Sequence, residues 1–247
     1  MSEGQKQLKI FRENIDAVDR LANFDRVVLD YSIKAIEDLQ NKLKRNFTNE
    51  SLLATRTLKD LNNIRVHDSM RTQYQEIFNQ CVVLLVSHFG STITELFKYY
   101  VTSNIDVLKN QKAFSEEFKL SPMEMSEFNF NLRDHIGEII ISKKNISFQD
   151  MQSINRSFKD FLNIDIVRDE INNDIIMGQA CRHVIVHSGS NPDKKMLRQI
   201  ASAVPRNLKP KIRESSKIQF DSKEIARLAT SMKMYVENLV NQLDETY

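Results

Sequence analysis

The sequence predicts an all-α fold, a helical bundle, and three observations support this prediction. Five glycines and four prolines in 247 residues are few for a protein with many turns, which favours a small number of long helices. Apolar residues recur at three- and four-residue spacing, which is the period of a helix with one buried face. Helix start and stop signals also flank several of these stretches.

The first expected element is a long amphipathic helix, or two helices separated near Asn23, that reaches about Arg45. Its apolar stripe comprises Phe11, Ile15, Val18 and Ala22, then Leu29, Ile33, Ile36 and Leu43. Asn49-Glu50-Ser51 can cap a following helix whose apolar face includes Leu52, Leu53, Leu58 and Leu61. We expect residues 1–66 to form a helical N-terminal extension to a domain that spans residues 70–247.

The segment from Thr72 to Tyr100 is expected to be the central buried helix. It is apolar on most faces around Cys81–Phe89, and its amphipathic continuation favours a helix over a strand. Residues 101–124 are expected to be irregular, with a break at Ser121-Pro122.

Four elements are expected in the second half of the chain. The first is a helix from Glu124 to Ile141. Ser147, three residues before Asp150, is expected to cap the next helix, which continues through Leu162.

A further helix is expected from about Val167 to the stop signal at Ser188-Gly189, which Pro192 reinforces. After a basic loop, Asp221-Ser222-Lys223-Glu224 is expected to start the last helix.

The composition is that of an ordinary globular protein, with 41% apolar and 28% charged residues. We find no run of about 18 apolar residues and no signal-peptide pattern at the N-terminus. Cys81 and Cys181 are too few for a disulfide framework and lie in apolar segments. We therefore expect two buried thiols in a cytoplasmic protein that does not span a membrane.

The segment from Lys194 to Lys217 is strongly basic, with eight lysines and arginines against the single acid Glu214. It carries +7, so the rest of the chain carries −5 within the net charge of +2. Such a surface suits an anionic polymer, although a solvated loop without a ligand is the alternative. The candidate residues for binding an RNA backbone are Lys194, Lys195, Arg198, Lys209, Lys211 and Arg213.

The segment Cys181–Gly189 contains the best candidate site. Arg182 is followed directly by His183, and His187 lies five residues after the arginine. A histidine transfers protons near neutral pH and an arginine neutralises phosphate charge, so these residue types suffice to cleave RNA without a metal. We therefore expect Arg182, His187 and His183 to be catalytic, with His187 as general base or acid, Arg182 stabilising the phosphate charge and His183 orienting or assisting, and with no metal and no cofactor.

The spacing of this motif leaves its geometry open. Residues five apart on an ideal helix point about 140° from each other, so Arg182 and His187 do not share a face by spacing alone. Either His187 is redirected at its helix end, or a second copy of the helix, packed across a two-fold axis, completes a composite site. A zinc site at His183 and His187, four residues apart, and a purely structural role for Arg182 and His187 are the alternatives.

The motif resembles the R-x4–6-H signature of the HEPN superfamily (higher eukaryote and prokaryote nucleotide-binding domains). Arg182-His183-Val184-Ile185-Val186-His187 matches it, with a polar residue directly after the arginine. Asn145–Met151, followed by Phe158 and Phe161–Ile164, and the helix around Val83–Phe89 are similar to the RiboL-PSP branch of that superfamily. The resemblance covers about residues 75–245.

This resemblance implies a dimeric HEPN-type helical bundle that cleaves RNA without a metal. Active members of the family act in toxin–antitoxin, abortive-infection and CRISPR-associated defence systems, which implies an antitoxin or a phage-defence partner. Related proteins often carry an acidic residue about where Gly90 lies here, and the nearest acid in this sequence is Glu95. A non-catalytic HEPN module that binds RNA, a nucleotide or a partner protein is therefore the alternative to an endoribonuclease.

Overall fold

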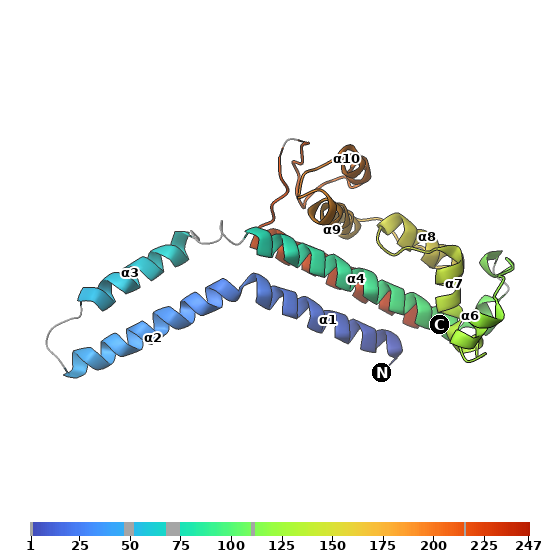
Figure 1. Ribbon diagram of the computed structural model, residues 1–247, viewed down its shortest axis with the longest axis horizontal. Helices are drawn as coiled ribbons and strands as arrows, with labels where there is room; N and C mark the ends of the chain where they lie inside the picture. The colour runs from blue at the N-terminus through green and yellow to red at the C-terminus, as the bar shows by residue number, and fades with distance from the viewer. Residues whose placement is uncertain (1, 47–51, 68–74, 110–111, 215) are drawn as a thin grey trace.

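The chain folds into an all-α bundle (Figure 1). The computed structural model describes residues 2–46, 52–67, 75–109, 112–214 and 216–247, and within these ranges every regular element is a helix. The predicted fold class is therefore confirmed.

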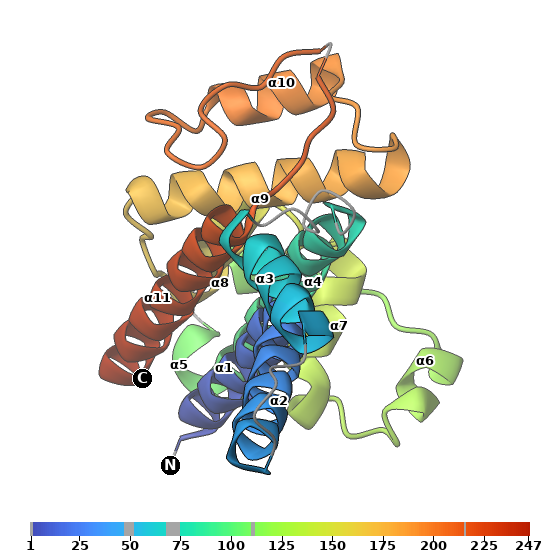
Figure 2. The same cartoon turned by 90° about the vertical axis from the view of Figure 1, so that its left-hand side faces the viewer.

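The helix α4 (Gln75–Ser103) lies at the centre of the bundle, as expected for the most apolar segment. The helices α1 (Glu3–Ala22), α9 (Glu170–His187) and α11 (Ser222–Thr246) pack against it, as Figures 1 and 2 show. The fully or nearly fully buried residues of α4 include Cys81, Val82, Leu85, Phe89, Ile93, Leu96, Phe97 and Val101. Burial on several faces explains why its apolar residues do not form a single stripe.

The first helix belongs to this core. Phe11 of α1 is completely buried, and its ring centroid lies 6.4 Å from that of Phe89, which in turn lies 5.4 Å from that of Tyr235 on α11. At the other end of α1, Tyr100 of α4 donates a hydrogen bond to Asp244 of α11. The apolar stripe of α1, which lies in the segment 1–66 expected to be an N-terminal extension, is thus buried against α4 and α11.

The helices α2 (Phe24–Asn46) and α3 (Leu52–His67) pack against each other and extend away from the core (Figure 1). The chain leaves α1 at Asn23, whose backbone N–H and side-chain amide both donate to the carbonyl of Asp19. Of the two alternatives expected here, one long helix or two helices separated near Asn23, the structure has the second. The expected cap at Asn49-Glu50-Ser51 lies outside the described residues.

The region after α4 differs from the expectation of one helix over Glu124–Ile141. Short helices α5 (Ile105–Leu108), η2 (Lys112–Phe114), α6 (Pro122–Glu127) and η3 (Arg133–His135) lead to α7 (Ile136–Lys144). The chain turns at Asn129 and Phe130, which have positive φ, so the predicted continuous helix is wrong. α6 has no buried residue, whereas Gly137 at the start of α7 packs closely against the backbone of Lys98.

The starts of the next two helices also differ from the sequence prediction. Asp150, and not Ser147, caps α8 (Met151–Leu162), because its carboxylate accepts a hydrogen bond from the Ser153 N–H at 2.8 Å. The Ser147 hydroxyl instead accepts from the N–H of Gln149 at 3.3 Å. α9 begins at Glu170 after its cap Asp169, three residues later than expected.

The last part of the chain contains one helix that the sequence did not predict. α10 (Lys194–Ala201), capped by Asp193, lies within the segment expected to be a basic loop. The helix start predicted at Asp221-Ser222-Lys223-Glu224 is confirmed, and it is a capping box, since Asp221 and Glu224 each accept a hydrogen bond from the other's backbone N–H.

By length and apolar composition, the segment Glu76–Ser103 of α4 meets the criteria for a membrane-spanning helix. Half of its most apolar window is buried inside the bundle. The core helix of a globular fold meets the same criteria, so this composition is weak support for a membrane span.

Replacing Phe11 by alanine tests whether α1 is part of the core. We expect the free energy of unfolding to fall by about 3–5 kcal/mol, because a fully buried aromatic ring is lost. Leu39→Ala on the exposed face of α2 is the control and should change it by less than about 0.5 kcal/mol. Equal and small effects in chemical denaturation would show that α1 folds separately from the core.

Candidate functional site

The candidate motif lies at the end of α9, where the sequence predicts a helix stop. The N–H groups of Ser188 and Ser190 both donate to the carbonyl of Val184, at 2.9 and 3.0 Å. Gly189 and Ser190 have φ values of 56° and 67°, the left-handed conformation that ends helices. The predicted end of the helix is confirmed.

This helix end is tied to two other parts of the fold. The side-chain amide of the buried Asn79, on α4, donates to the Ser190 hydroxyl and to the Ile218 carbonyl, both at 3.3 Å. The backbone N–H of Ile218 donates to the Ser190 carbonyl at 2.8 Å. These bonds fix the last turn of α9, and therefore its histidines, relative to α4.

An open groove of about 1410 Å³ lies beside α9. Its walls come from α4, from the segment that leads into α8 together with the first turns of that helix, from α9 and from α10. α9 lies between α4 and α10 (Figure 2), so its side chains can reach the groove along most of the length of the helix.

The groove contains Arg182 and His183 but not His187. On α9 the groove-lining residues Asn172, Ile176, Gln179 and His183 follow each other at spacings of four, three and four residues, and thus occupy one face. His187, one turn further on, is exposed at the end of this face. Its ring centroid lies 4.9 Å from that of His183, so the two histidines are neighbours.

The groove is cationic. Four basic side chains line it, those of Arg168, Arg182, Lys195 and Arg198, against the single carboxylate of Asp150. That carboxylate already accepts a hydrogen bond as the cap of α8. Among the described residues Arg182 forms no ion pair, in contrast to the structural role considered for it.

His183 has a pKa below its usual value near 6.5. Partial burial disfavours the charged imidazolium, and the positive charge of Lys195 lowers the pKa further, with smaller contributions from His187 and Arg182. Asp193 acts in the opposite direction. His183 is therefore neutral at pH 7 and has a free nitrogen lone pair that can accept a proton.

The six basic candidates from the sequence fall into three groups. Lys195 and Arg198 line the groove, whereas the neighbouring Lys194 is exposed and does not. Lys209 is only 17% exposed; its ammonium pairs with Glu224 at 2.7 Å and lies 4.8 Å from the ring centroid of Phe220.

Lys209 therefore holds the loop against α11 and is not free to bind a ligand, contrary to the sequence prediction. Lys211 and Arg213 are exposed outside the groove wall. Of the six candidates, the structure brings only Lys195 and Arg198 together with Arg182 and His183.

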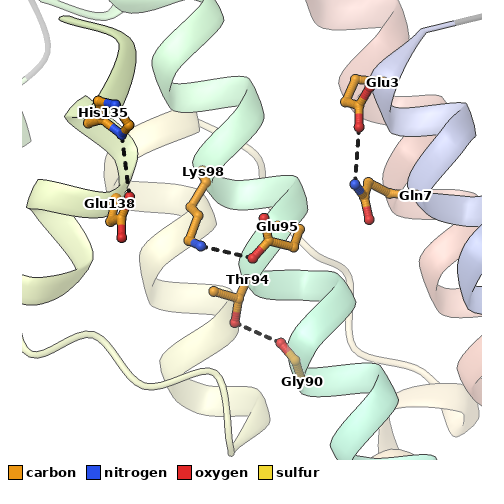
Figure 3. Close-up of polar contacts among 8 residues, drawn as sticks. All are labelled: Glu3, Gln7, Gly90, Thr94, Glu95, Lys98, His135 and Glu138. Atoms are coloured by element: carbon orange, nitrogen blue, oxygen red, sulfur yellow. Dashed lines mark hydrogen bonds and ion pairs between the residues drawn. The ribbon is translucent and has the colours of Figure 1, made fainter. Parts of the chain in front are cut away.

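The structure also shows where Gly90 lies, the position at which related proteins often carry an acidic residue. Gly90 lines the groove, so this position of α4 does lie opposite the candidate motif. Glu95, the nearest acid in sequence, does not line the groove and pairs with Lys98 at 2.8 Å (Figure 3). The carboxylate that raises the pKa of His183 is instead that of Asp193, in the loop after α9.

The sequence prediction missed the polar groove residues that precede the motif. Arg168, Asn172 and Gln179 line the groove together with Asn155 of α8. The repeat of polar residues at 172, 179 and 183 was the available signal, because these positions share the helix face of the candidate histidine.

The described residues contain neither a candidate metal cluster nor a cysteine with a lowered pKa. In the described ranges, no cluster of three or more His, Cys, Asp or Glu side chains could hold a metal ion. Burial raises the pKa of the Cys81 thiol to about 11 and that of Cys181 to about 12, so both remain protonated at neutral pH.

Comparison of the chain with protein-family models, curated proteins and solved structures finds no match.

The lowered pKa of His183 predicts the pH at which its imidazole is half protonated. In an NMR titration we expect the His183 midpoint to lie below 6.5 and to rise in Lys195→Gln, which removes one cause of the shift. Lys194→Gln, one residue away and outside the groove, should leave it unchanged. A wild-type midpoint at or above 6.5 would contradict the assigned environment.

The sign of the effect on stability follows from the same shift. The unfolded chain binds this proton more tightly than the folded chain, so the contribution of His183 is complete above pH 6.5. That contribution is lost as the pH falls from 6.5 through the folded-state pKa.

Proposed function

We propose that this protein is a metal-independent endoribonuclease of the HEPN type that acts at the α9 groove. The observation that carries this proposal is the position of Arg182 and the neutral His183 side by side in the wall of a cationic groove. An RNA chain needs a groove of positive potential, and its cleavage needs proton transfer next to a charge that stabilises the phosphate.

The reaction follows from the chemistry of these groups. His183 takes the proton from the ribose 2′-OH, whose oxygen then attacks the adjacent phosphorus. Arg182 stabilises the added negative charge of the phosphorane. A proton passes to the 5′-oxygen as the P–O bond breaks, so the products are a 2′,3′-cyclic phosphate and a 5′-OH.

His187 is the second proton-transfer group in this proposal. It adjoins His183 but is exposed at the mouth of the groove, which suits delivery of a proton to the leaving oxygen. Its exposure also leaves it free to complete the groove of a second copy, so a homodimer with a composite site is part of the proposal.

The remaining parts of the proposal concern partners and location. Lys195, Arg198 and Arg168 hold the RNA backbone. A cytoplasmic location and an antitoxin or defence-system partner that restrains the activity complete it.

A non-catalytic RNA-binding module is the second candidate. It is favoured by one observation, the presence of Gly90 in the groove while Glu95 is paired elsewhere. Such a module would bind RNA through the same basic side chains and leave it intact.

Cleavage of RNA by the purified protein in EDTA separates these candidates. We expect Arg182→Ala to lower the rate about 10²–10³-fold, because a charge that stabilises the transition state is lost. His183→Ala and His187→Ala should each lower it about 10²–10⁴-fold. Analysis of the RNA ends should show a 2′,3′-cyclic phosphate and a 5′-OH.

His135→Ala is the control for this experiment, since His135 lies beside Glu138 and away from the groove (Figure 3). Its rate should equal that of the wild type. Binding without cleavage across a broad set of RNAs would favour the non-catalytic module, and cleavage that survives in His183→Ala and His187→Ala would contradict the mechanism.

The groove lysine and arginine predict a specific salt dependence. We expect the double variant Lys195→Gln, Arg198→Gln to bind RNA more weakly and to reduce the slope of log K against log salt by about one per lost phosphate contact. Lys211→Gln, Arg213→Gln changes the net charge equally but outside the groove, and should leave most of the slope intact. Equal slopes in the two double variants would place the RNA elsewhere.

A further inference from the structure

Gln179 is the least expected residue in the groove wall. It lies in the middle of α9, is only 4% exposed, and lines the groove. Neither its amide nitrogen nor its amide oxygen has a hydrogen-bond partner among the described residues. Buried polar side chains in folded proteins are nearly always hydrogen-bonded, so an unpartnered amide in a groove wall requires an explanation.

Other polar groups of the same groove are satisfied within the fold. On α4 the Ser87 hydroxyl donates to the Val83 carbonyl and the Thr94 hydroxyl to the Gly90 carbonyl, both at 2.7 Å (the second in Figure 3). The groove therefore does not lack partners for polar groups in general. The unpartnered groups of its wall belong to amide side chains on α8 and α9.

Asn172 is 3% exposed and lies two turns before Gln179 on α9. Its side chain has a hydrogen-bond partner for its nitrogen but not for its oxygen. Its amide nitrogen donates to the Val167 carbonyl at 3.1 Å and to the Asp169 carboxylate at 2.8 Å, which fixes its orientation. Its oxygen is left without a partner, as is the side-chain oxygen of Asn155. The unpartnered groups are thus three acceptor oxygens and one donor nitrogen.

We propose that Gln179 of α9, together with the side-chain oxygen of Asn155 on α8, forms a nucleobase-recognition site, and that it selects bases with an exocyclic amine. Such an amine offers N–H donors to amide oxygens, while the ring nitrogen beside it in adenine and cytosine accepts from the Gln179 nitrogen. Uracil presents two carbonyl oxygens and one N–H, which fits an acceptor-rich wall poorly. This inference rests on the proposed function, because it takes RNA to be the ligand.

The position of Gln179 places this base next to the reacting phosphate. Arg182 and His183 follow it by three and four residues, so they lie one helical turn away, about 4.5–6 Å along the axis. The three residues point to the same side of α9. Gln179 has three rotatable side-chain bonds, so a turn of its end group brings the amide out to a bound base.

The experiment compares binding of 2′-O-methyl oligocytidine and oligouridine, which lack the 2′-OH needed for cleavage. We expect the wild type to bind oligocytidine at least about tenfold more tightly, the usual discrimination of a good pair of base contacts. Gln179→Met, which keeps the side-chain volume and removes both polar atoms, should bring this ratio close to one without weakening binding of oligouridine. Gln152→Met is the control, because Gln152 lines the groove with an exposed side chain.

The outcomes for base recognition by Gln179 can be distinguished from the outcomes for RNA cleavage. A base preference that Gln179→Met abolishes supports the inference even where the wild type does not cleave unmodified RNA. Equal ratios in the wild type and Gln179→Met overturn it, even where cleavage is observed. A melting temperature that rises in Gln179→Met together with an unchanged ratio identifies a merely buried amide, and absence of RNA binding overturns both proposals.

Discussion

The burial of α4 is the constraint on which the rest of the structure depends. A helix that is apolar on several faces must be covered on several faces, and α1, α9 and α11 provide that cover. Small residues at Ser87, Gly90, Ser91 and Thr94 follow one another along the remaining stripe. No large side chain of α4 fills the space beside them, so the same helix that forms the core also forms one wall of the groove.

Buried polar residues of α9 differ in whether their side chains have hydrogen-bond partners within the fold. Asp174 is buried, and its carboxylate accepts hydrogen bonds from Arg227 at 2.7 Å and Ser231 at 2.9 Å, which joins α9 to α11. Gln179 is equally buried but faces the groove without such partners. One carboxylate oxygen of Asp174 is therefore used by the fold, whereas both polar atoms of Gln179 lack a hydrogen-bond partner among the described residues.

Local signals predicted the elements that they alone determine. The break considered near Asn23, the stop at Ser188-Gly189 and the helix start at Asp221 depend on side chains a few residues apart, and the structure has all three. The turn at Asn129 could not be predicted in this way, because it depends on how α7 must cross α4 at Gly137. Tertiary packing overrode a helical pattern there.

The same distinction applies to the candidate site. The motif itself is local, so Arg182 and His183 could be named from the sequence, whereas the residues that surround them come from three other elements. Charge composition alone did not separate Lys195, which lines the groove, from Lys209, which Glu224 and Phe220 hold in place. Only the course of the chain between α10 and α11 makes that difference.

The electrostatics of the groove link ligand binding to proton transfer. Partial burial lowers the pKa of His183 most, and the charge of Lys195 lowers it further, so in the free protein the neutral imidazole, the form that accepts a proton, is favoured. A phosphate placed beside Lys195 and Arg182 would offset their field and favour the imidazolium. In the proposed function, binding of RNA would then raise the proton affinity of His183 for the step in which it takes the proton from the 2′-OH. Lys195 and Arg182 would thus have two roles in the proposed function, since both line the groove that would hold phosphate and both lower the pKa of His183.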